Sequence, residues 1–82
     1  FKKSINCCLL NEEKNEILLF GELNNSLKVN IDTLEIEQYL LNDETIFAAT
    51  FSMDRKNIFI GGQNQKIMMI NYDIFIIDRI LF

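Results

Sequence analysis

The residue types that usually carry chemistry are few in this sequence, and their spacing is not that of a catalytic site. The 82 residues contain no histidine, no glycine-rich phosphate loop and no Gly-x-Ser-x-Gly turn. Two close pairs of carboxylates, Glu12 with Glu13 and Glu35 with Glu37, have the composition of a general acid and base. The first pair falls in an expected turn and the second on an expected solvent-facing strand. We therefore expect no enzymatic activity from these residues.

The two cysteines, Cys7 and Cys8, are adjacent in the sequence. Consecutive residues of a strand point to opposite faces, so a disulfide between them is not expected. Without a histidine, two cysteines also cannot complete the four ligands of a structural zinc site, and no metal or other cofactor is expected. We interpret both as small core side chains. This usage favours a reducing intracellular compartment, cytoplasmic or nuclear.

Charge and hydropathy argue against nucleic acid and membrane partners. The net charge is −4, and the basic residues are scattered rather than clustered as phosphate binding requires. The most hydrophobic stretch, residues 67–82, contains Asp73, Asp78 and Arg79 and is shorter than the roughly 20 apolar residues of a spanning helix. No signal peptide is apparent, and a start at Phe1 instead of methionine suggests a trimmed longer protein.

The sequence contains an internal repeat, and this repeat predicts the architecture. Residues 4–10 align with 45–51 at a shift of 41, and residues 20–21 and 27–29 align with 60–61 and 67–69 at a shift of 40. We interpret the change from a shift of 41 to a shift of 40 as a turn that is one residue shorter in the second repeat. A period of this size is that of one four-stranded propeller blade.

Short runs rich in Ile, Val and Phe, separated by turn-prone residues, favour strands over helices. The expected strands are residues 5–10, 16–21, 26–31, 34–40, 46–51, 57–61, 66–71 and 74–80. Residues 17–20 and 58–60 are apolar on both faces and predict central strands, whereas the alternation of residues 34–37 predicts an outer edge. Residues 74–82 are also compatible with a short amphipathic helix, although the repeat favours a strand.

The predicted fold class is all-β, with two four-stranded antiparallel blades of an incomplete β-propeller. The blades are expected to span about residues 4–41 and 45–82. A propeller usually has four to eight blades, so two cannot close a ring. Each end blade would leave an apolar face in water, and the isolated chain is expected to associate or to fold poorly.

The second repeat resembles a WD40 repeat. Residues 46–54 are similar to the first strand of that family and its Ser-Pro-Asp-Gly turn, and residues 58–71 are similar to the strand, turn and strand that follow. The sequence departs from the family at Asn42, near the place of Gly-His, at Asn64 in the place of the turn aspartate, and at residues 70–71 in the place of Trp-Asp. The polar network of such blades is therefore expected to be missing, so that apolar packing must replace it.

The resemblance implies a non-catalytic scaffold for protein–protein interaction, a subunit of a larger intracellular complex. Its partners would be other proteins and the remaining blades of the parent chain. The alternative is a segment of an enzymatic or small-ligand-binding propeller whose active residues lie outside this chain. The resemblance places partner binding on the loops that enter the first strand and join the second to the third, with positive charge opposite Asp43 and Glu44. The seven residues predicted to bind a partner are Asn24, Asn25, Asn42, Asp43, Glu44, Asn64 and Gln65.

Overall fold

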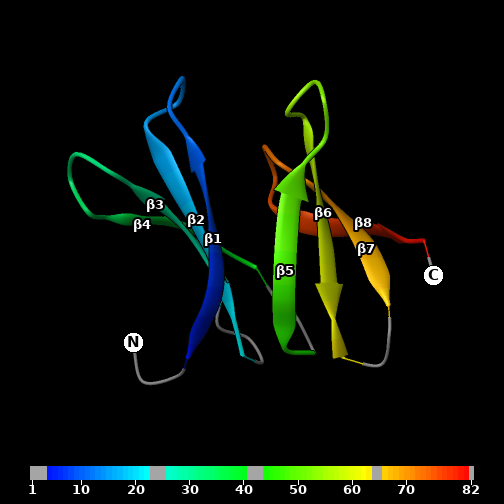
Figure 1. Cartoon of the computed structure of the whole chain (residues 1–82). Coiled ribbons are helices and arrows are strands. Elements are labelled where there is room, and N and C mark those ends of the chain that lie inside the picture. Colours follow the sequence, from blue (N-terminus) through cyan, green and yellow to red (C-terminus); the bar gives the residue numbers. More distant parts are fainter. Residues whose placement is uncertain (1–3, 23–25, 41–43, 64–65, 82) are drawn as a thin grey trace.

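A computed structural model describes residues 4–22, 26–40, 44–63 and 66–81. It is all-β, with two four-stranded antiparallel sheets of strand order β1-β2-β3-β4 and β5-β6-β7-β8 (Figure 1). We call these sheet 1 and sheet 2. The described residues contain no α-helix. The strands are β1 Ile5–Asn11, β2 Glu16–Gly21, β3 Ser26–Asn30, β4 Ile36–Leu40, β5 Ile46–Phe51, β6 Asn57–Gly62, β7 Ile67–Asn71 and β8 Ile76–Ile80. All eight expected strands are present.

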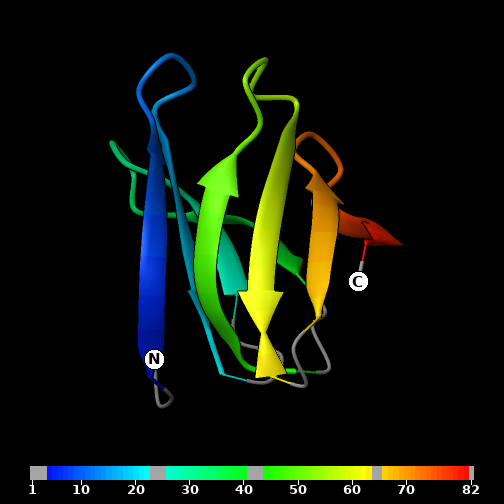
Figure 2. The same ribbon diagram turned by 45° about the vertical axis from the view of Figure 1, so that its right-hand side comes forward.

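The two sheets lie face to face, and each is a meander in which neighbours in sequence are neighbours in space. Strands β1 and β5 lie side by side, as Figures 1 and 2 both show. The later strands of each sheet turn strongly across the first, which is the expected twist of a sheet. Strands β2 and β6 have neighbours on both sides, and β4 is an edge strand, as predicted.

Two strands begin two residues later than expected, because a turn residue with positive φ precedes each. Leu34 has a φ of 62° and Phe75 a φ of 54°. Their amides donate to Asn30 O at 2.8 Å and Asn71 O at 2.9 Å. The tight turn thus extends to residue 35 in sheet 1 and to residue 75 in sheet 2. The alternative of a helix after residue 74 is wrong, since β8 occupies that place.

Strand pairing shows a constant shift of 41 residues between the repeats. Gly21 pairs with Ile5 and Gly62 pairs with Ile46, each next to a β-bulge. The predicted alignments of residues 20–21 with 60–61 and of residues 27–29 with 67–69 are therefore each wrong by one residue, and the turn does not differ in length between the repeats. The physical reason is that the backbone needs glycine beside the bulge: a Cβ would lie 2.1 Å from Ser4 O at Gly21 and 2.6 Å from Thr45 O at Gly62. At Gly61 no atom lies within 4 Å of such a Cβ.

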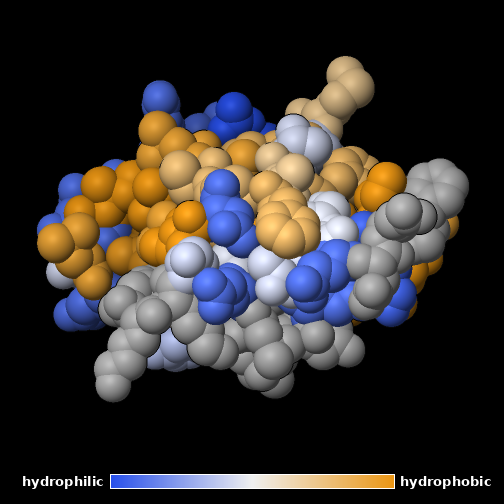
Figure 3. Space-filling model, turned by 60° about the horizontal axis from the view of Figure 1, so that its bottom comes forward, coloured by the Kyte–Doolittle hydropathy of each residue, from blue (hydrophilic) through white to orange (hydrophobic). Residues whose placement is uncertain are grey.

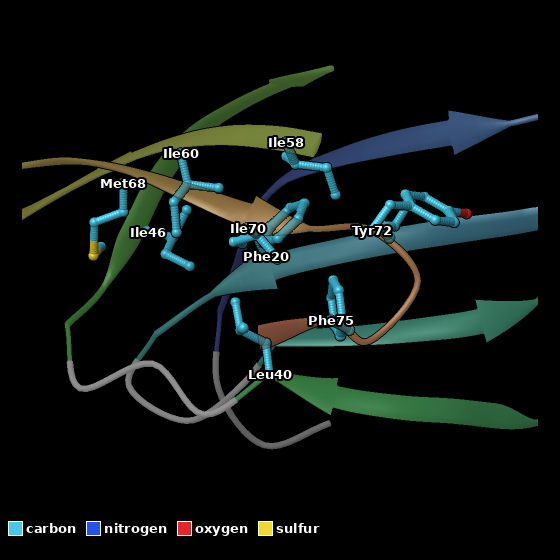
Figure 4. Close-up of a cluster of buried hydrophobic side chains, with 10 residues drawn as sticks. Phe20, Leu40, Ile46, Ile58, Ile60, Met68, Ile70, Tyr72 and Phe75 are labelled. Carbon is cyan, nitrogen blue, oxygen red and sulfur yellow. The ribbon is translucent and has the colours of Figure 1, made fainter. Parts of the chain in front are cut away.

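The core lies between the sheets and is formed by opposite faces of the two repeats. Sheet 1 contributes Leu18 and Phe20, whereas sheet 2 contributes Ile58, Ile60 and Ile70. With the shift of 41, Ile58 and Ile60 correspond to Ile17 and Leu19, which lie on the other face of sheet 1. Figure 4 shows the resulting cluster, whose remaining members are Leu40, Ile46, Met68, Tyr72 and Phe75.

The cysteines divide between these faces. Cys7 is partly buried against the core, and Cys8 is exposed on the outer face of sheet 1. The prediction of two core side chains is therefore wrong for Cys8, because adjacent strand residues face opposite ways. Both thiols are free. Burial, followed by the neighbouring Cys8, raises the pKa of Cys7, which disfavours its reactive thiolate form.

Candidate functional site

Of the seven residues predicted to bind a partner, the structure describes Glu44. Its side chain is 8% exposed, and its Oε1 lies 3.1 Å from Lys66 Nζ. Glu44 thus offers little surface to a partner, because its carboxylate is turned into an ion pair. The other six lie outside the described residues: Asn24, Asn25, Asn42, Asp43, Asn64 and Gln65.

The described residues beside these loops form a closely bonded end of the molecule. The Glu22 amide donates to Ser4 O at 3.3 Å, and the Gln63 amide donates to Thr45 O at 3.1 Å. The Ser4 amide in turn donates to Glu22 Oε1 at 3.3 Å. Each repeat therefore closes this end in the same way: the carbonyl of Ser4 or Thr45 accepts a hydrogen bond from the amide of the residue that follows the glycine. Figure 3 shows hydrophilic side chains interspersed with hydrophobic ones on this end.

A second polar cluster, which we call the intersheet cluster, joins the sheets near the opposite end. Its centre is Lys28, which is 2% exposed. The Lys28 ammonium donates to Tyr72 O and lies 4.1 Å from the centroid of the Tyr72 ring and 5.1 Å from that of Phe75. Burial lowers the pKa of Lys28, against the opposing effect of Glu16 and Asp73. Its contacts cross from sheet 1 to sheet 2.

Carboxylates complete the intersheet cluster. The Tyr72 hydroxyl donates to Glu16 Oε1, and burial followed by this bond raises the pKa of Tyr72. Burial acts to raise the pKa of Glu16, but hydrogen bonds with Glu37 and Tyr72 outweigh it and the pKa is lowered. The hydrogen bond with Glu16 raises the pKa of Glu37. Glu37 thus pairs with Glu16 of another strand, and not with Glu35, its close neighbour in sequence.

Further bonds join the sheets around this centre. Lys14 Nζ lies 2.9 Å from Asp73 Oδ1, and Gln38 Nε2 donates to Asp73 O at 3.0 Å. At the other end of β1, Asn6 Nδ2 donates to Ile46 O at 2.8 Å. The Asn6 amide serves to fasten β1 to β5.

The intersheet cluster has ionisable groups with shifted pKa values, but its geometry is structural. Lys28 and Tyr72 are 2% and 1% exposed, so a substrate could not reach the ammonium or the hydroxyl. This cluster was not predicted from the sequence. A signal was available, because Lys28 is a charged residue between Leu27 and Val29 of an expected strand, and the predicted alignment places Met68 opposite it in the second repeat.

A hollow of about 290 Å³ lies on the outer face of sheet 2, the face turned away from sheet 1. Ala48, Thr50, Phe59 and Gly61 line it. The hollow is apolar and open, and Gly61 stands where sheet 1 has Phe20. Within the described ranges, no group of three or more His, Cys, Asp or Glu residues could hold a metal ion. The described part of the chain also has no helix long and apolar enough to cross a membrane.

No protein-family model, curated protein or solved structure matches this chain.

Proposed function

We propose that this chain is a two-blade segment of a WD40-like β-propeller that acts as a non-catalytic scaffold for other proteins in an intracellular complex. The observation that carries the proposal is the meeting of opposite faces at a constant shift of 41 residues. Two sheets of a sandwich that are related by a two-fold axis would meet through equivalent faces. A propeller instead repeats one step around an axis, so that the front of each blade meets the back of the next.

The turn after β5 also supports the resemblance to WD40 repeats. Ser52 Oγ donates to Asp54 Oδ1 at 2.7 Å, and the Lys56 amide donates to the same oxygen at 3.0 Å. The hydrogen bond from Ser52, followed by that from Lys56, lowers the pKa of Asp54. The serine and aspartate thus order this turn, in the places that Ser-Pro-Asp-Gly has in the family.

The proposed contact surface is the end of the molecule that carries the loops before β1 and β5 and after β2 and β6. The burial of Glu44 leaves Asp43 as the acidic residue to test. Charge complementarity acts chiefly on the rate of association, so reversal of the Asp43 charge is expected to slow the association of a basic partner and to lower the amount that co-purifies.

The test compares Asp43→Lys with Glu13→Lys in the tagged chain. Glu13 is an exposed residue of the β1–β2 turn, at the opposite end, so the control makes the same change of charge away from the proposed surface. We expect Asp43→Lys to lose co-purifying proteins, quantified by mass spectrometry, that Glu13→Lys retains, while both keep the melting temperature. An unchanged set of partners in the Asp43→Lys variant would contradict the proposal.

A further inference from the structure

The outer face of sheet 1 exposes large apolar residues at positions that sheet 2 uses to contact sheet 1. Ile5 and Leu34 are 42% and 76% exposed, whereas their equivalents 41 positions later, Ile46 and Phe75, are both 0% exposed. Leu10 and Ile36 are 47% and 45% exposed, and their equivalents, Phe51 and Ile77, pack against the core. The outer face of sheet 1 thus has the same pattern of apolar residues as the face of sheet 2 that is buried against sheet 1. Figure 3 shows this apolar surface on the sheet 1 side, at the left.

The outer face of sheet 2 has the complementary pattern. It corresponds to the face by which sheet 1 contacts sheet 2, with apolar residues in the place of two polar ones. Phe47, which is 55% exposed, stands where Asn6 fastens the sheets, and Met69 stands where Lys28 lies. Gly61 replaces Phe20 and leaves the hollow of about 290 Å³. This face can therefore receive an apolar surface without burying a charge at its centre.

Charges at the rim also match. In the contact between the sheets, Asp73 accepts from Gln38 through its carbonyl and pairs with Lys14 through its carboxylate. The equivalent of Asp73 is the exposed Asp32, on the turn after β3. The equivalents of Gln38 and Lys14 are Arg79 and Arg55, both exposed on sheet 2. Arg55 now lies over the Phe51 ring, 5.0 Å from its centroid, so Arg79 is the better placed of the two.

We propose that the outer face of sheet 2 binds the outer face of sheet 1 of a second copy of this chain, head to tail, with Arg79 opposite Asp32. The contact repeats the step that relates the two sheets within one chain. It buries Ile5, Leu10, Leu34 and Ile36 of one copy against the hollow and the aromatic residues of the next. Because the two surfaces differ, the association is heterologous: it forms a ring where the rotation between copies closes and an open filament where it does not. If the proposed propeller is correct, closure is expected at about two to four copies, that is, four to eight blades.

The test uses two variants of the 82-residue chain, each blocked on one face. Gly61→Lys places a long charged side chain in the hollow of sheet 2, where there is space for it. Cys8→Glu places a charge on the outer face of sheet 1, at an exposed position. Both should fold, as circular dichroism can verify. Size-exclusion chromatography with light scattering then measures the mass of each variant, of the unmodified chain and of an equal mixture.

We expect the unmodified chain to associate, each variant alone to be a monomer, and the mixture to form a one-to-one dimer. That dimer arises because each variant keeps the face that the other has lost. A monomeric unmodified chain, or a blocked variant that still associates by itself, would overturn the proposal. The second of these results would indicate contact between identical faces.

A charge swap tests the same contact without blocking a face. Asp32→Lys or Arg79→Glu alone places like charges opposite one another, and we expect the dissociation constant to rise by about tenfold. The double variant restores an opposite pair at every contact and should recover the original affinity. Equal weakening in the single and double variants would refute the pairing. None of these changes touches the loop end proposed for other partners, so loss of one interaction is distinguishable from loss of the other.

Discussion

Two adjacent glycines should respond in opposite ways to the same substitution. Replacing Gly62 with alanine puts a Cβ 2.6 Å from Thr45 O, whereas ordinary contacts begin at 3.4 Å. The neighbouring strand must move, and the bond from the Gln63 amide to Thr45 O moves with it. Replacing Gly61 with alanine meets no atom within 4 Å. No glycine in the described residues has a positive φ, so backbone conformation does not forbid either change.

The magnitudes follow from these contacts. Gly62→Ala is an overpacking change against backbone, and we expect it to lower the free energy of unfolding by about 1–3 kcal/mol. Gly61→Ala restricts the unfolded chain without a clash, so a gain of about 0.4–1 kcal/mol is expected. For a chain of this length 1 kcal/mol corresponds to about 4–8 °C in melting temperature. Gly61→Ala should therefore melt above the unmodified protein and Gly62→Ala below it.

Urea unfolding followed by circular dichroism measures both changes. The measurements must be made at one protein concentration and repeated at a second, because association stabilises the folded state by mass action. If the two variants shift the midpoint in the same direction by similar amounts, the assignment of Gly62 to the bulge and Gly61 to open space would be refuted.

Three other changes test the contact between the sheets. Phe75→Ala should lower the free energy of unfolding by about 3–5 kcal/mol, because Phe75 is fully buried. Leu34→Ala, at the equivalent but exposed position, should lower it by less than about 0.5 kcal/mol in the monomer, and urea titration measures both. Lys28→Met copies the second repeat and removes a buried charge, so the urea midpoint should hold or rise; a loss above about 2 kcal/mol would contradict this. The raised pKa of Tyr72 gives stability that is present below its ordinary value of 10.0 and is lost as pH rises above it, while the lowered pKa of Lys28 acts in the opposite direction. The melting temperature should therefore fall less steeply between pH 8 and pH 11 for Tyr72→Phe than for the unmodified protein. Equal slopes of melting temperature against pH would contradict this.

The strands were predictable because their signals are local. Apolar runs of β-branched and aromatic residues, separated by turn residues, give the type and order of all eight strands. Their late starts at Ile36 and Ile76 were not predictable, since leucine and phenylalanine rarely adopt the positive φ that Leu34 and Phe75 have. That conformation is maintained by bonds to Asn30 and Asn71, and in the case of Phe75 by burial.

Of the two candidate sites, one could be predicted from the sequence and the other could not. The loop end follows from the repeat and from the directions of successive strands. The intersheet cluster does not, because Lys28 and Tyr72 lie 44 positions apart and Glu16 meets Tyr72 from 56 positions away. Nothing in the local sequence around Glu16 indicates that its carboxylate will accept from a tyrosine of the second repeat.

The sequence by itself determined the all-β class, an approximate period of about 40 residues and the order of the strands, since hydrophobic spacing and turn chemistry act within a few residues. Only the tertiary structure decided which face of each sheet is buried. Leu18 and Leu19 are both apolar, and either face of β2 could have formed a core. Packing of sheet 2 against one face buried Leu18 and left Leu19 on the other. The same packing buried Lys28 beside the rings of Tyr72 and Phe75, because burial depends on contacts between repeats that the local sequence does not encode. The roles of Gly21 and Gly62 come instead from strand pairing within each sheet.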